Sequence, residues 1–186
     1  VLCDAVMPEG YRFDWDANEI AGVVLGKSTW AVLALTLNIE LFTQVHYRES
    51  IDGDATVSEL FKDIFKFHWM EESQHAIIDE LEFRRVDAVL APEERDAAVD
   101  DFIELVGAVD GVLQGQALAD AAYFAAAAGR PAVLEEGRKV QDLLLRAYRW
   151  QYILSGAANP RFQAVMDELL TDEQGLRIQA ALGTLQ

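Results

Sequence analysis

Residues 67–80, FHWMEESQHAIIDE, place three potential metal-binding side chains among large apolar residues. At about 100° per residue along a helix, Glu72 lies about 40° and His75 about 20° from His68, so all three share one narrow face. A carboxylate on an apolar helix face is costly when it stays charged and unpaired. The stretch therefore predicts a core helix whose polar groups are compensated by a metal ion, an arginine or a shifted pKa.

On either side of this stretch the sequence indicates helices almost everywhere. Capping-box patterns start at Asp16, Thr56 and Thr171, and Pro92 stands where a first helical residue is expected. No stretch shows sustained strand alternation with hairpin turns. The sequence predicts four long helices followed by two short ones, at residues 17–49, 57–89, 92–128, 131–155, 160–170 and about 171–182.

The connections between the four long helices are short, which makes sequential helices antiparallel neighbours. A chain of 186 residues without a linker or a repeat fits one domain. We therefore expect a single all-α domain over residues 1–186, folded as an antiparallel four-helix bundle with short C-terminal helices.

The composition excludes several classes of partner. A formal net charge of -17 repels nucleic acid and anionic membranes. The most apolar run, STWAVLALTL at residues 28–37, has about half the ~20 residues that a membrane span needs. Cys3 is the single cysteine and has no intramolecular disulfide partner, so a reducing cytoplasm is the expected location.

A second carboxylate, Glu40, lies on the apolar face of the first long helix. If the turn between the first two helices centres near residue 54, Glu40 is level with His68 and about one helical turn from Glu72. A Glu on one helix and a Glu-x-x-His on the next form half of a di-iron carboxylate pattern. Positions i and i+3 project onto one ion, and the mixed oxygen and nitrogen ligands suit iron or manganese. Glu40, Glu72 and His75 are therefore candidate metal ligands.

With these residues in place, the chain resembles the ferritin-like superfamily over residues 17–155. TLNIELFTQVHY (36–47) resembles its first ligand helix and EESQHAIIDE (71–80) its second. His68-x-x-x-Glu72-x-x-His75 also resembles a ligand helix of the p-aminobenzoate N-oxygenase group, which would add His68 as a ligand. The resemblance implies one or two iron ions, or manganese, that activate O2 or peroxide for a small-molecule substrate. Tyr148 or Tyr152 would relay electrons or protons.

The second half of the chain departs from the ferritin-like pattern. In an antiparallel bundle, the residues of the third helix that lie level with Glu72 and His68 include Asp110 and Gln114. The corresponding stretch of the fourth helix contains Arg146 and Arg149 but no Glu-x-x-His. Two readings remain open. Asp110 is a further ligand of a single ion, or an arginine takes the place of a second ion and neutralises the carboxylates.

Two other functions stay open beside the metal-dependent oxidase or oxygenase. The first is a ferritin-like fold without catalysis that serves as a binding or assembly module. We expect a homodimer for such a module. The second is the haem-oxygenase-like architecture, which also uses Glu plus Glu-x-x-His but usually adds a later Asp-x-x-x-His; here no histidine follows His75. The segment YRWQYILSG (148–156) is expected to line a pocket or to contact the terminal helices.

Overall fold

The computed structural model describes residues 9–12, 16–129 and 134–185. Every regular element among these residues is helical, as predicted, and the model contains no strand in the described ranges. None of the described helices is both long and apolar enough to cross a membrane.

Most predicted helix boundaries are confirmed to within two residues. The structure has α4 at Glu59–Asp87, α5 at Pro92–Ala127, α8 at Pro160–Leu169 and α9 at Asp172–Gly183. Ser58, rather than Thr56, caps α4 by accepting a hydrogen bond from the amide of Phe61. Thr56 instead binds Asp54 in the preceding turn.

The predicted helix at 17–49 is wrong as a single element. The structure divides it into α2 (Ala17–Leu25), α3 (Thr29–His46) and a π-helical turn, η1 (Tyr47–Ile51). Gly26 ends α2, and the Ser28 hydroxyl accepts from the Ala31 amide to start α3. Because a new N-cap begins so soon, α2 is free to leave the axis of α3 and pack on α5.

The predicted fourth helix is also divided into shorter elements. It contains α6 (Leu134–Arg149), the π-helical turn η2 (Trp150–Leu154) and the short α7 (Ser155–Ala157). The first three residues of the predicted range, 131–133, lie outside the described residues. A π turn widens the helix locally and changes which side chains face a neighbour.

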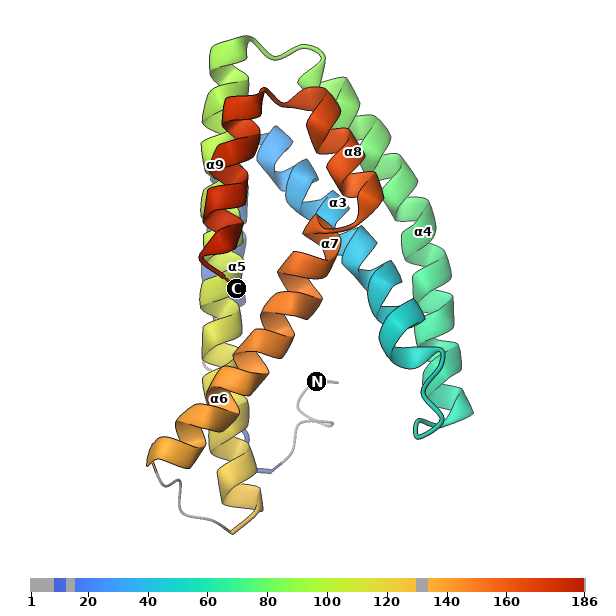
Figure 1. The fold of residues 1–186 in the computed structure, drawn as a ribbon, viewed down its shortest axis with the longest axis vertical. Coiled ribbons are helices and arrows are strands. Elements are labelled where there is room, and N and C mark those ends of the chain that lie inside the picture. Colours follow the sequence, from blue (N-terminus) through green and yellow to red (C-terminus); the bar gives the residue numbers. More distant parts are fainter. Residues whose placement is uncertain (1–8, 13–15, 130–133, 186) are drawn as a thin grey trace.

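The helices form two antiparallel pairs that meet at one end of the molecule (Figure 1). Helix α3 packs along α4, and α5 packs along α6. Helix α3 also contacts α5 and α7, whereas α4 and α5 diverge from the connection that joins them. Helices α8 and α9 lie across the junction, against α4 and α5 respectively.

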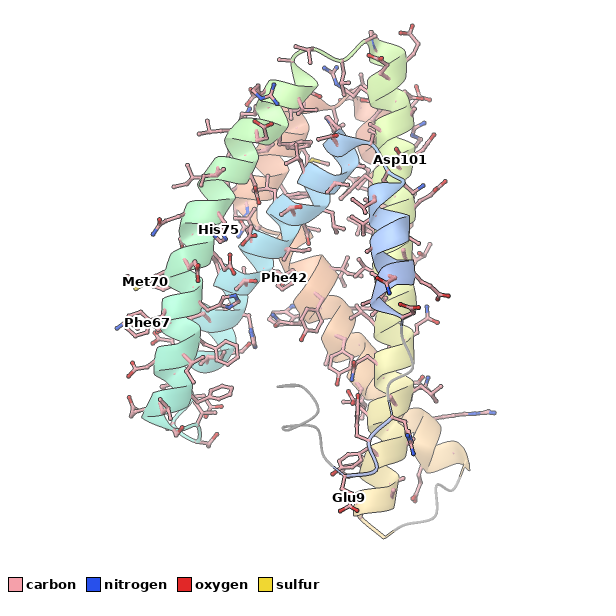
Figure 2. The ribbon with its side chains drawn as sticks, turned by 180° about the vertical axis from the view of Figure 1, so that it is seen from behind. Glu9, Phe42, Phe67, Met70, His75 and Asp101 are labelled. Carbon is pink, nitrogen blue, oxygen red and sulfur yellow. The ribbon has the colours of Figure 1, made fainter. Side chains whose placement is uncertain are left out.

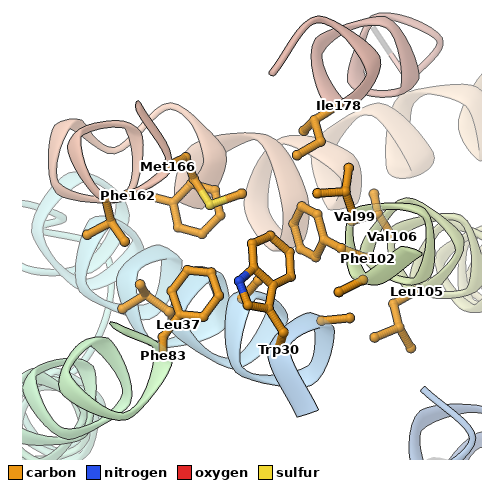
Figure 3. Close-up of a cluster of buried hydrophobic side chains, with 14 of the residues drawn as sticks. Trp30, Leu37, Phe83, Val99, Phe102, Leu105, Val106, Phe162, Met166 and Ile178 are labelled. Atoms are coloured by element: carbon orange, nitrogen blue, oxygen red, sulfur yellow. The ribbon is translucent and has the colours of Figure 1, made fainter. Parts of the chain in front are cut away.

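The hydrophobic core fills this junction (Figure 3). Trp30 and Phe83 are almost fully buried, with ring centroids 4.8 Å apart. The indole Nε1 of Trp30 donates to Asp87 Oδ1 over 2.8 Å, and Arg95 binds both oxygens of the same carboxylate. A buried carboxylate is tolerated here because an arginine neutralises it. The core therefore fixes α3 and α4 relative to each other at one end. It thereby positions the middle of the two helices, which carries the predicted ligands Glu40, Glu72 and His75.

Candidate metal centre

The predicted ligands of the first two long helices come together between α3 and α4. One ligand atom each of Glu40, Glu72 and His75 lies within 4.8 Å of the others. Within α4 the spacing follows from helix geometry alone, because residues three and four apart lie on one face. Glu40 is added by the antiparallel packing of α3 along α4, as the expected turn near residue 54 requires.

Two imidazoles hold the carboxylate of Glu72. His68 Nε2 lies 2.6 Å from Oε1, and His75 Nδ1 lies 2.6 Å from Oε2. Only 15% of the Glu72 side chain is exposed, against 48% and 47% for the two histidines. The carboxylate is therefore shielded, and the histidines form the edge of the site that faces solvent. With Nδ1 of His75 bound to a carboxylate, its Nε2 is the ring nitrogen left for a metal.

Glu40 has less compensation for its charge. Its Oε2 is buried and has no hydrogen-bond partner among the described residues. Burial, contact with Glu72 and the negative charges of Glu72 and Asp79 raise the pKa of Glu40 to about 8. Burial alone would also raise the pKa of Glu72, but its contacts with Glu40, His75 and His68 outweigh burial and lower it. The pair therefore holds one proton near neutral pH, on Glu40.

A third carboxylate, Asp79, lies beside this pair. Burial raises the pKa of Asp79, the charge of His75 opposes that change, and the charge of Glu72 adds to it. Asp79 was not among the ligands predicted from the sequence. Its signal was available, because a residue seven positions after Glu72 lies about 20° from it on the helix.

Asp110 lies in a separate ion pair between α5 and α6. Arg149 donates to it twice, over 2.6 Å from Nε and 2.9 Å from Nη2, and Gln114 donates over 2.7 Å. The ion pairs of the described residues thus join Arg149 to Asp110, and they join no arginine or lysine to Glu40 or Glu72. The neutralisation expected from Arg146 or Arg149 is therefore not found among the ion pairs of the described residues, and Arg149 has its own acidic partner.

The two candidate tyrosines lie on the far side of α3 from Glu40. The Tyr148 hydroxyl donates to Asp120 over 2.5 Å, and burial together with this bond raises the pKa of Tyr148. Tyr152 packs edge-on against Phe42, with ring centroids 5.4 Å apart, and its ring centroid lies 6.1 Å from that of Tyr148. Phe42 lies two residues from Glu40, about 200° around the helix. The tyrosines therefore reach α3 but not the ligand face.

A hollow of about 590 Å³ opens along the segment 148–156, which was expected to line a pocket. Its lining residues are His46, Leu143, Arg146, Ala147, Tyr148, Trp150, Gln151 and Tyr152. Aromatic walls with a few polar groups are typical of small-molecule sites. No family model, curated protein or solved structure gives a significant match to this chain.

Proposed function

We propose that this protein is a ferritin-like metal-binding protein that holds iron between α3 and α4. The observation that carries the proposal is the Glu40, Glu72 and His75 group, in which a buried carboxylate oxygen lacks a partner and no described arginine or lysine forms an ion pair with either acid. Two carboxylates and an imidazole suit iron or manganese. His68, bound to the same Glu72 carboxylate, is the fourth candidate ligand.

The residues fit a divalent cation better than they fit a purely structural network. A cation next to Glu40 would replace the proton that this carboxylate holds, and it would give the unpartnered oxygen a ligand role. The three or four candidate ligands would leave coordination positions of a divalent ion free. An open coordination position is what distinguishes a reactive metal site from a closed structural one.

We further propose that the protein oxidises a small molecule with O2. Bound iron would supply the redox chemistry, while the chain binds and orients the substrate. Tyr152 would transfer electrons across α3, because the row Tyr148–Tyr152–Phe42, with ring-centroid separations of 6.1 and 5.4 Å, ends at Phe42 on the side of α3 away from Glu40. The hollow of about 590 Å³ beside Tyr148 and Tyr152 is large enough for a small substrate.

Metal analysis of the purified protein tests the first step. The protein is expressed with iron or manganese supplementation, and the metal content is measured by mass spectrometry for wild type, Glu72→Ala and Glu71→Ala. Glu71 is the neighbouring exposed acid on α4 and controls for the loss of one negative charge. Wild type and Glu71→Ala are expected to retain metal and Glu72→Ala to lose it. Absence of metal from the supplemented wild type would contradict the proposal.

A further inference from the structure

The candidate metal centre lies on an uncovered face of the α3–α4 pair. Figure 2 shows α3 and α4 side by side, with His75 at their border and no helix in front of them. The exposure of His68 and His75 agrees with this view. The opposite side of α4 is the covered one, because Arg161 of α8 binds Glu80 there. The two histidines of the site therefore face away from the other described helices.

The second helix pair of the same chain cannot complete this site. Helices α5 and α6 lie on the other side of α3, next to η2 and α7. Their buried acid, Asp110, is already held by Arg149 and Gln114. A bundle site of the ferritin-like type needs ligands from four helices. The described residues supply candidate ligands from two helices, with the two histidines at the solvent-facing edge.

The uncovered face carries apolar side chains around the ligands. Phe61 and Ile64 border His68 along α4 and are 42% and 58% exposed, while Ile39, next to Glu40 on α3, is 38% exposed. At about 100° per residue, Phe61 lies about 20° from Glu72 around the helix and Ile64 about 80°. Large apolar groups that surround a polar centre are typical of a protein interface rather than of a solvated surface.

We propose that a second copy of this chain covers the face, so that two α3–α4 pairs related by a twofold axis form a four-helix bundle around two metal ions. The proposal rests on the proposed metal-binding function. Each copy contributes Glu40 and Glu72-x-x-His75. The dimer then has one Glu from each of two helices and one Glu-x-x-His from each of the other two, which is the complete di-metal ligand set. A twofold axis produces this set because it presents the same face from both copies.

The direction of the ligands agrees with this arrangement. In a bundle, each helix has two neighbours at about right angles, and the centre lies between them. On α4, Phe65 and Phe83 face α3, because their rings contact His46 and Trp30 of that helix. Glu72 lies about 20° around α4 from both phenylalanines, in the direction of the uncovered face. His68 and His75 lie further around in the same direction. Glu72 would thus point to the centre of a bundle that the second copy completes.

The size of the face is that of a small interface. Helix α3 has 18 residues and is about 27 Å long, and two packed helices are about 20 Å wide. A face of these dimensions covers about 540 Å², about two thirds of the ~800 Å² per partner of a standard interface, so the shared metal ions would have to contribute to the stability of the dimer. Other exposed apolar residues on α4, Phe67 and Met70 among them, point to the outer edge away from α3 and are not needed for it (Figure 2).

Charge links dimer formation to the metal. Without metal, a dimer would bring the Glu72 and Asp79 carboxylates of both copies together in a chain whose net charge is already -17. Like charges in a poorly hydrated interface oppose association. Divalent cations would reverse that repulsion, so the metal-free protein is expected to be a monomer and the metal-loaded protein a dimer.

Sedimentation velocity of the full chain, with excess Mn²⁺ and with a chelator, tests this inference. Wild type is expected to double its mass with Mn²⁺. Ile64→Glu is expected to remain monomeric and to bind Mn²⁺ at least tenfold more weakly, although an added carboxylate would by itself attract the ion. Leu118→Glu on α5 is the matched control, since both side chains are 58% exposed, and it is expected to behave as wild type.

Electron paramagnetic resonance of the same samples gives a second readout. Two Mn²⁺ ions about 3.5–4 Å apart in a shared site are magnetically coupled, whereas isolated ions give six-line spectra. Coupled spectra from the wild-type dimer would support the inference. A monomer that binds Mn²⁺ with equal affinity in wild type and Ile64→Glu would overturn it and leave the proposed function intact. Absence of metal binding in every form would overturn both.

Discussion

Arg149 donates two hydrogen bonds to Asp110, from Nε over 2.6 Å and from Nη2 over 2.9 Å, and so closes the α5–α6 pair as an independent unit. Asp110 is 5% exposed, and the nearby guanidinium, opposed by burial and helped by Gln114, lowers its pKa. This carboxylate is therefore fully compensated within the chain. Among the described residues Glu40 on α3 has no such cation, and this contrast between a buried and a partly buried acid supports the proposed metal site between α3 and α4.

Arg149→Met is expected to lower the free energy of unfolding by about 3 kcal/mol, because it leaves the Asp110 charge buried and unpaired. Urea denaturation at pH 7 measures the change. Arg138→Met, at an exposed position of the same helix, is the control and is expected to change stability by less than about 0.5 kcal/mol.

The Arg149–Asp110 pair also predicts that the free energy of unfolding falls in acid. The folded pKa of Asp110 is depressed, so its contribution is present above the unfolded pKa and is lost as the pH falls through the folded pKa.

Metal binding is expected to release a proton from Glu40. Its pKa of about 8 means that this carboxyl is mostly protonated at pH 7 and must ionise to become a ligand. Metal affinity should therefore rise as the pH increases towards 8 and level off above it. Isothermal titration with Mn²⁺ at pH 7, in buffers of different ionisation enthalpy, counts the released protons. Glu40→Gln is expected to lose both the proton release and most of the affinity. An unchanged proton count in Glu40→Gln would show that another group supplies the proton.

The metal-free protein is expected to lose stability as the pH rises from about 4.5 to about 8. The folded state keeps the Glu40 proton over this range, with its pKa raised to about 8, while the unfolded chain releases it near 4.5, the ordinary pKa of a glutamate side chain. The folded state thus binds more protons, which makes the slope of stability against pH negative. Thermal unfolding in a chelating buffer measures the slope. Glu40→Gln, which cannot ionise, should have a flatter profile over this range, and equal slopes in the two proteins would contradict the assignment.

Gly156→Ala is expected to destabilise the fold by about 2–3 kcal/mol through overpacking. A Cβ at this position would lie 2.5 Å from the carbonyl oxygen of Asn38, so α3 and α7 would have to move apart. The backbone of α3 cannot yield as a flexible side chain would. Differential scanning calorimetry measures the loss.

Gly107→Ala on α5 is the control for Gly156→Ala. A Cβ there meets nothing within 4 Å, so the higher helix propensity of alanine should stabilise the protein by about 0.5–1 kcal/mol. If both substitutions shift the melting temperature in the same direction, close contact between α3 and α7 is not what makes glycine necessary at position 156.

Much of the local structure was predictable from short-range signals. The boundaries of α4, α5, α8 and α9 follow caps and prolines, and the shared face of Glu72 and His75 follows from their spacing. The turn length placed Glu40 level with His68 and about one helical turn from Glu72, and the structure brings Glu40 close to Glu72 and His75. The division into α2 and α3 was not predicted, because the apolar pattern continues on both sides of Gly26 and Ser28. A glycine within such a pattern ends a helix only when the next residues supply a new cap.

The sequence by itself determined that the chain is helical and that His68, Glu72 and His75 share one face of a helix, because backbone hydrogen bonds and side-chain periodicity act over a few residues. Only the tertiary structure decided that Arg149 meets Asp110 instead of Glu40, and that the α3–α4 pair turns its ligands away from α5 and α6. The rotation of one helix pair against another depends on many weak packing contacts between distant residues. No single sequence motif therefore predicts how the two helix pairs are oriented.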